Sequence, residues 1–102
     1  MAIGTILIYK LSSHNNIGYY EISSNDFNIN NFYMSIDKSK KIIKFFLTKD
    51  FSNNPIRIID YNKNEAIGSI PGVPTMVFTI VLRHAFRVFT MDTFPESLSY
   101  AA

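Results

Sequence analysis

Residues 74–91 read PTMVFTIVLRHAFRVFTM, and this stretch decides the architecture of the chain. A strand of this length would far exceed the usual ~5–6 residues, although the β-branched content and a partial alternation are compatible with a strand. Pro74 suits the first position of a helix. Four polar residues recur at the four-residue steps of one helical stripe, namely Thr75, Thr79, Arg83 and Arg87. We therefore predict a helix over about 74–91 that is buried on most of its circumference.

The chain before this helix is divided into short apolar runs by turn-forming residues. Residues 14–18 read HNNIG, and residues 61–64 read YNKN; asparagine and glycine tolerate the left-handed conformations that tight turns require. Within 32–48, alternation places Phe32, Met34 and Ile36 on one face of a strand. The runs predict strands over residues 3–11, 19–23, 32–36, 41–48, 56–60 and 65–70.

These elements predict an α+β fold in a single domain spanning residues 1–102. An antiparallel β-meander of about six strands, between residues 3 and 70, would form a half-barrel or a sandwich and pack against one C-terminal α-helix. After the helix, the spacing of Thr93 and Glu96 is that of a capping box, so we expect a short final turn through Leu98 and Tyr100.

Composition excludes several classes of site. The 102 residues include no cysteine, which excludes disulfides, thiolate metal sites and a cysteine nucleophile. No apolar run reaches the ~18 residues of a membrane span, and the N-terminus lacks the basic region of a signal peptide, so we expect a cytoplasmic protein that does not enter a membrane.

Catalytic motifs are missing from the sequence. The two histidines, His14 and His84, could serve a metal-independent ribonuclease only if the fold brought them together, and the eight acidic residues are dispersed. No pair of histidines has the spacing of a metal site. We therefore expect no catalytic residue, no metal site and no cofactor.

Positive charge is concentrated in the middle of the chain. Residues 38–63 carry seven basic and two acidic residues, whereas the whole chain has a net charge of +2. Lysines beside an aromatic ring can pair with phosphates and stack on bases. Lys40, Lys44 and Phe46 are therefore candidates for binding single-stranded nucleic acid, although lysines at a hairpin tip also discourage edge-to-edge pairing.

Aromatic and acidic residues lie close together in residues 19–33. Aromatic side chains are enriched at protein interfaces, while alternation sends about half of those in a strand to the core. The candidates for contacts with a protein partner are Tyr19, Glu21, Asp26 and Tyr33.

The chain resembles a family of small bacterial proteins. The residues that carry the resemblance are FYMSIDKSKKIIKFFL, NPIRIIDYNKNEAIGSIPG and the ending FPESLSYAA after the predicted helix. The chain is also small, lacks catalytic motifs and is rich in Asn, Ile and Lys, which suggests an AT-rich coding sequence. In these respects it is similar to the immunity proteins of contact-dependent growth inhibition and other polymorphic-toxin systems.

The resemblance implies a non-enzymatic, cytoplasmic protein that binds one cognate toxin, often a nuclease, and blocks its active site. The slightly basic net charge differs from the acidic balance common among inhibitors of basic nucleases, which would confine the contact to a local acidic patch. Two alternatives stay open: a small single-stranded nucleic-acid-binding domain and a β-barrel that encloses a small apolar ligand. The sequence leaves the oligomeric state open.

Overall fold

The computed structural model describes residues 5–24, 28–98 and 100–101, which form one antiparallel sheet and one helix, α1 (Thr75–Val88). The predicted α+β class with a C-terminal helix is confirmed. The strands are β1 (Thr5–His14), β2 (Ile17–Ser24), β3 (Phe32–Asp37), β4 (Ile42–Phe46), β5 (Arg57–Asp60), β6 (Glu65–Gly68) and β7 (Tyr100–Ala101).

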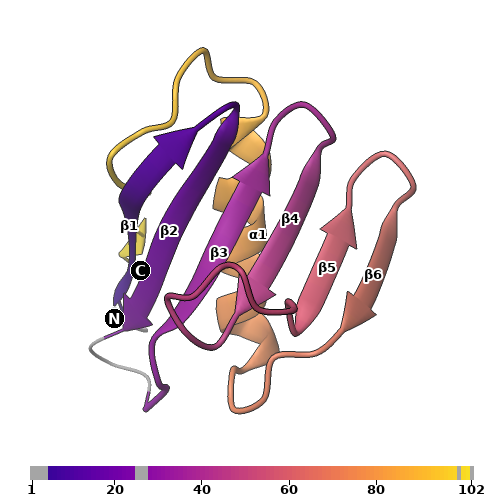
Figure 1. The fold of residues 1–102 in the computed structure, drawn as a ribbon. Coiled ribbons are helices and arrows are strands. Elements are labelled where there is room, and N and C mark those ends of the chain that lie inside the picture. The colour runs from indigo at the N-terminus through magenta and orange to yellow at the C-terminus, as the bar shows by residue number, and fades with distance from the viewer. Residues whose placement is uncertain (1–4, 25–27, 99, 102) are drawn as a thin grey trace.

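The sheet is a meander whose strand order is β6-β5-β4-β3-β2-β1-β7. All strands in the described residues belong to one sheet, so they do not divide into the two layers of a sandwich, and β6 and β7 are the edges of that sheet. The strands therefore do not close into the barrel that one sequence-based alternative required. Figure 1 shows α1 behind the sheet and the connection between β4 and β5 in front of it.

The predicted C-terminal turn is wrong in part. The chain after α1 returns along β1, where Leu98 N donates to Ile8 O over 2.8 Å and β7 pairs with the start of β1. Pairing there supplies partners for backbone groups at the free edge of β1, which a local turn would leave exposed.

The tight turns follow from residues that tolerate a positive φ. Asn15 and Asn16, with φ of 50° and 65°, form the two-residue connection between β1 and β2, as the HNNIG segment predicted. Asn64, at φ 53°, ends the connection between β5 and β6.

The core lies between α1 and the inner face of the sheet. Alternate strand residues point toward the helix, and Phe45 of β4 lies 5.0 Å from Phe78 of α1 between ring centroids. Residues of the core with less than 2% exposure include Ile6, Ile8, Tyr20, Ile22, Phe32, Met34, Ile36, Ile43, Phe45, Val77, Val81 and Val88. The predicted polar stripe of α1 faces solvent.

Helix α1 begins one residue later and ends three residues earlier than predicted. Pro74 is extended, with ψ of 146°, and precedes the first helical residue. At the other end the Thr90 hydroxyl donates to Arg87 O over 2.8 Å and satisfies a terminal carbonyl. In the part of the chain that the structure describes, no helix is long and apolar enough to cross a membrane.

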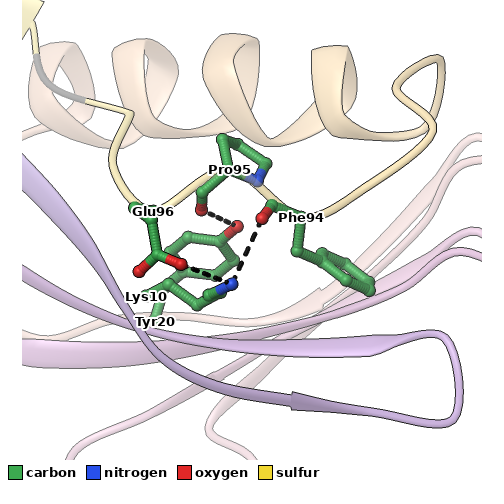
Figure 2. Close-up of polar contacts among 5 residues, drawn as sticks. All are labelled: Lys10, Tyr20, Phe94, Pro95 and Glu96. Carbon is green, nitrogen blue, oxygen red and sulfur yellow. Dashed lines mark hydrogen bonds and ion pairs between the residues drawn. The ribbon is translucent and has the colours of Figure 1, made fainter.

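Side chains of β1 and β2 hold the segment after α1 against the sheet (Figure 2). The Tyr20 hydroxyl donates to Pro95 O over 2.8 Å, and Lys10 Nζ donates to Phe94 O at 3.3 Å. Lys10 also pairs with the exposed Glu96 at 2.9 Å. Because Tyr20 is fully buried, its hydrogen bond is the contact that places the segment.

Gly18 provides the space for Phe94 in this segment. A β-carbon at Gly18 would lie 2.4 Å from the Phe94 ring, closer than unbonded carbons approach. The glycine of the HNNIG segment therefore permits packing between the start of β2 and a residue far away in the sequence.

Replacing Val81 with aspartate should abolish cooperative unfolding. Val81 has no exposed surface, and an unpaired carboxylate there would cost at least about 3 kcal/mol. Thermal melting followed by circular dichroism measures the effect. The control is Arg83→Asp on the exposed stripe; a normal melt for Val81→Asp would contradict the packing of α1.

Stability should decline at high pH because of Tyr20. Burial, with a smaller contribution from the Glu96 charge, raises the pKa of Tyr20 from 10.0 to about 12. The folded pKa lies above the unfolded value, so this contribution is complete below pH 10 and is lost as pH rises toward 12. Ionisation of Tyr20 at high pH should therefore lower the free energy of unfolding by about 2–3 kcal/mol.

The Tyr20→Phe variant tests this contribution. It should be about 1 kcal/mol less stable at neutral pH, because it lacks the hydrogen bond, and should lose less stability between pH 10 and 12. Urea unfolding at each pH measures both. Parallel pH profiles for the two proteins would show that Tyr20 is not the group responsible.

Candidate functional site

The candidate site lies on the outer face of the sheet, opposite α1. Pairing of β2, β3 and β4 places Tyr19, Ser35 and Lys44 side by side, and places Glu21, Tyr33 and Phe46 side by side two residues along. Because side chains alternate between faces, both rows point away from the helix. We call these six residues the outer-face cluster.

The loop of residues 47–55 folds over the outer-face cluster. The Asp50 carboxylate accepts hydrogen bonds from Ser52 N, at 3.0 Å, and from the Ser52 hydroxyl. This short-range turn is typical of aspartate and places Phe51 on the sheet. The same hydrogen bonds lower the pKa of Asp50.

Phe51 is the centre of an aromatic group on the outer face. Its ring centroid lies 4.7 Å from Tyr19, 5.1 Å from Phe46 and 6.4 Å from Tyr33. Sequence reasoning missed Phe51 because it interpreted the residues after the predicted strand 41–48, as far as Pro55, as a polar loop. A lone aromatic between the turn-forming residues Asp50 and Ser52 was the signal available.

The structure brings the two sets of sequence-predicted residues into one surface. Tyr19, Glu21 and Tyr33, proposed for a protein partner, lie beside Lys44 and Phe46, proposed for nucleic acid. The two hypotheses therefore concern the same face of the sheet.

Two candidate residues lie elsewhere. Lys40 lies at the exposed turn between β3 and β4, where its backbone N–H donates to Asp37 Oδ1 over 3.0 Å. Asp26 lies outside the described residues, so its role stays a prediction.

Phe46 and Tyr33 are covered rather than exposed. The Phe46 side chain is only 4% exposed beneath Phe51, and Tyr33 is also buried. Neither ring can stack on a base or a partner while the loop keeps this position, because the stacking face is occupied. Their prediction as contact residues therefore needs correction: they support the loop that forms the surface.

Glu21 and Tyr33 form the polar edge of the aromatic group. Lys49 of the loop lies 3.6 Å from Glu21 Oε2, and Tyr33 hydrogen-bonds to the Glu21 side chain. Burial, followed by the charge of Glu21, raises the pKa of Tyr33. Glu21 therefore links β3 to the loop and retains partial exposure.

A polar hollow of about 290 Å³ opens beside Phe51. It exists because the small, buried Ser35 lies between the larger side chains of Tyr19 and Lys44. The hollow has room for a single side chain or a small polar molecule. Residues that line it are Ile17, Tyr19, Ser35, Asp37, Ile42, Lys44, Phe46 and residues 51–55.

The lysines of the β3–β4 hairpin do not form one basic surface. Lys38 Nζ donates to Met91 O over 2.5 Å and lies 4.6 Å from the centroid of the Phe94 ring. Lys41 Nζ lies 5.8 Å from the Tyr61 ring, which packs on α1, whereas Lys44 belongs to the outer face. The hairpin thus divides its charge between two sides of the sheet.

The histidines lie on different elements. His14 is exposed at the end of β1, and His84 is partly buried on α1, behind the sheet. Burial lowers the pKa of His84, and the charges of Arg87 and Arg83 add to the effect. Among the described residues, no group of three histidine, cysteine, aspartate or glutamate residues could hold a metal ion.

Strand β1 carries two further exposed residues, Tyr9 and Leu11, and Tyr9 extends the site because it lies opposite Glu21. Their exposed fractions are 47% and 43%. The pairing of β1 with β2 shifts between Lys10 and Ser12, so Leu11 is the extra residue of an irregularity. The sequence did not reveal this exposure because the shift interrupts the alternation on which the assignment of faces depends.

Comparison of the chain with protein-family models, curated proteins and solved structures finds no significant match. The site is therefore interpreted from its own geometry.

Removing the Phe51 ring should release the loop from the sheet. Phe51→Ala should lower the free energy of unfolding by about 2 kcal/mol, since the ring contacts three aromatic residues. Chemical denaturation measures the loss. Asn54→Ala in the same loop is the control and should change stability by less than about 0.5 kcal/mol; equal effects would contradict the role of Phe51.

Proposed function

We propose that this chain is a protein-binding domain that neutralises a cognate bacterial toxin, in the manner of an immunity protein, and that it binds through the outer face of its sheet. The observation that carries the proposal is the open surface over β1 and β2. There Tyr9 is exposed opposite Glu21, and Tyr19 lies two residues before Glu21 on the same face of β2. A large apolar and aromatic surface with a polar rim is typical of protein interfaces.

The charge of this face supports a basic partner. In the described strands, the pairing register places four carboxylates on the outer face, those of Glu21, Asp37, Asp60 and Glu65. It places one lysine there, Lys44. Lys49 of the loop pairs with Glu21, and even with this lysine counted the outer face keeps more carboxylates than lysines, although the whole chain is basic. A nuclease toxin has a positively charged substrate site, because it binds phosphates.

Inhibition would follow from occlusion. A protein that covers the phosphate-binding residues of a nuclease prevents substrate access without any chemistry of its own. The exposed rings supply the buried centre of the contact, and the carboxylates supply complementary charge and rapid association.

Binding of single-stranded nucleic acid has less support. It would require an exposed ring beside several lysines, whereas Phe46 is covered and the hairpin lysines are divided between two sides of the sheet. The same local acidity would repel phosphates.

The proposal is tested with the protein encoded immediately upstream of this protein's gene, which the proposal expects to be the toxin. The wild-type chain should bind it, block its activity and protect cells that express it. Glu21→Lys and Tyr9→Ala should each weaken binding at least tenfold, about 1.4 kcal/mol, because they reverse a charge and remove an exposed ring. Titration calorimetry measures the affinity.

Arg83→Glu is the matched control, because Arg83 is exposed on α1 and faces away from the sheet. It should leave binding unchanged. Failure of the wild-type chain to bind or protect would refute the immunity function. Loss of binding in the α1 variant alone would show that the wrong face has been chosen.

A further inference from the structure

A second surface lies at the other end of the sheet, between β6 and α1. An open groove of about 560 Å³ separates the inner face of β5 and β6 from the helix. Ile59 and Ala66 form its sheet wall, while Leu82 and Phe86 form its helix wall. In Figure 1, α1 lies behind the middle strands, and β5 and β6 extend beyond it. The helix therefore leaves the end strand uncovered.

Strand β6 is an exposed edge of the sheet. All four of its residues are exposed, and Ile67 is 64% exposed. Tyr61 N donates to Lys41 O, so the backbone of Tyr61 bonds toward β4. Successive residues of a strand bond to opposite sides, so the N–H and C=O of Asp60 point toward β6, where Asp60 pairs with Glu65. In an antiparallel ladder the next residue, Ala66, turns its N–H and C=O outward.

The neighbouring strand β5 has an unpaired side-chain donor. Arg57 lines the groove, and its Nε is buried without a hydrogen-bond partner, although its Nη1 donates to Gly68 O over 2.6 Å. The guanidinium is held 4.5 Å from the Phe78 ring. A buried, unpaired donor costs free energy that an added acceptor would recover.

The geometry points to β6 and this groove as a binding site for an extended segment of a partner protein, which adds to the sheet as an antiparallel strand. Ala66 exchanges two backbone hydrogen bonds with the partner residue opposite it. Opposite residues share a face, so that partner side chain enters the groove between Ala66 and Phe86. This is strand addition beside a helix, in which the backbone gives affinity and the groove gives specificity.

The charges at the two ends of the groove define the segment. Arg57 lies opposite Gly68 on the inward face of β5 and β6. Asp60 and Glu65 occupy outward strand positions but line the other end of the groove together with Asn64. An antiparallel segment passes Gly68 first, so an acidic side chain there would meet Arg57. A large apolar residue follows two positions later, opposite Ala66. The next inward position lies opposite Asn64 at the end of the groove that the two carboxylates line, so a basic residue is favoured there. The predicted pattern is acid-x-apolar-x-base.

A second copy of this chain fits the groove less well. Symmetric antiparallel pairing of β6 with β6 of a second copy requires a two-fold axis perpendicular to the sheet. Such an axis leaves the inward face of both copies on the same side of the joined sheet. The copy would then present only its own Ala66 and Gly68 to the groove, because these are the inward positions of β6. They are too small to fill a volume of about 560 Å³.

The test uses the full chain and a labelled synthetic peptide, SDVFVKS, that carries the pattern. Binding at up to about 1 mM peptide should shift the amide resonances of Ala66, Ile67 and Phe86. The peptide SKVFVDS, with its charges exchanged, should bind at least fivefold more weakly. Absence of shifts with SDVFVKS, or equal binding of the two peptides, would overturn the proposal.

Two changes isolate the edge hydrogen bonds. Ala66→Pro removes the outward N–H of residue 66 but no hydrogen bond to β5, and edge strands tolerate proline at such a position. The variant should bind the peptide at least tenfold more weakly and should have an unchanged melting temperature. N-methylation of the peptide phenylalanine should have the same effect on the unaltered protein. Retained affinity in the N-methylated peptide would exclude strand addition, even if the proline variant failed to fold.

Two controls separate this site from its alternatives. Glu21→Lys on the outer face should leave peptide binding unchanged, so loss of toxin binding and loss of peptide binding can be distinguished. Sedimentation should show a monomer for the wild-type chain. A dimer that Ala66→Pro dissociates would instead assign the β6 edge to a second copy and overturn the inference.

Discussion

The structure depends on the packing of α1 against one face of a meander. Alternate residues of five strands and one side of the helix meet in a core that includes Tyr20, Phe45 and Val81. The burial of this apolar surface is the main source of stability. The helix covers only the middle of the sheet. The outer face and the two edges of the sheet are therefore left for other segments of the chain, or for partners, to cover.

Four parts of the sheet lie beyond the helix: two are covered by other segments of the chain, and two stay exposed. The 47–55 loop covers the middle of the outer face through Phe51. The segment after α1 covers the free edge of β1 and is held by Tyr20 and Lys10. The outer face of β1 and the edge of β6 keep exposed apolar side chains, Tyr9 and Ile67 among them. Uncovered apolar surface on an otherwise well-packed domain is where partners bind.

Much of the fold could be predicted because its signals are local. The alternation correctly placed Phe32, Met34 and Ile36 on one face, which is the core face, and the asparagines of HNNIG predicted a turn. The candidate site was predicted in part: Tyr19, Glu21 and Lys44 do lie on one face. Phe46 and Tyr33 were assigned contact roles that the structure corrects, because the residue that covers them, Phe51, comes from a different segment.

The sequence by itself determined the fold class, the core face of residues 32–36 and the position of the helix. Each of these follows from a periodicity within about ten residues and from the local conformational preferences of proline and asparagine. Only the tertiary structure decided which aromatic rings are exposed, how the hairpin lysines are divided and where an edge strand meets an open groove. These properties depend on contacts between distant segments, such as Gly18 with Phe94 and Arg57 with Phe78, which no local pattern encodes.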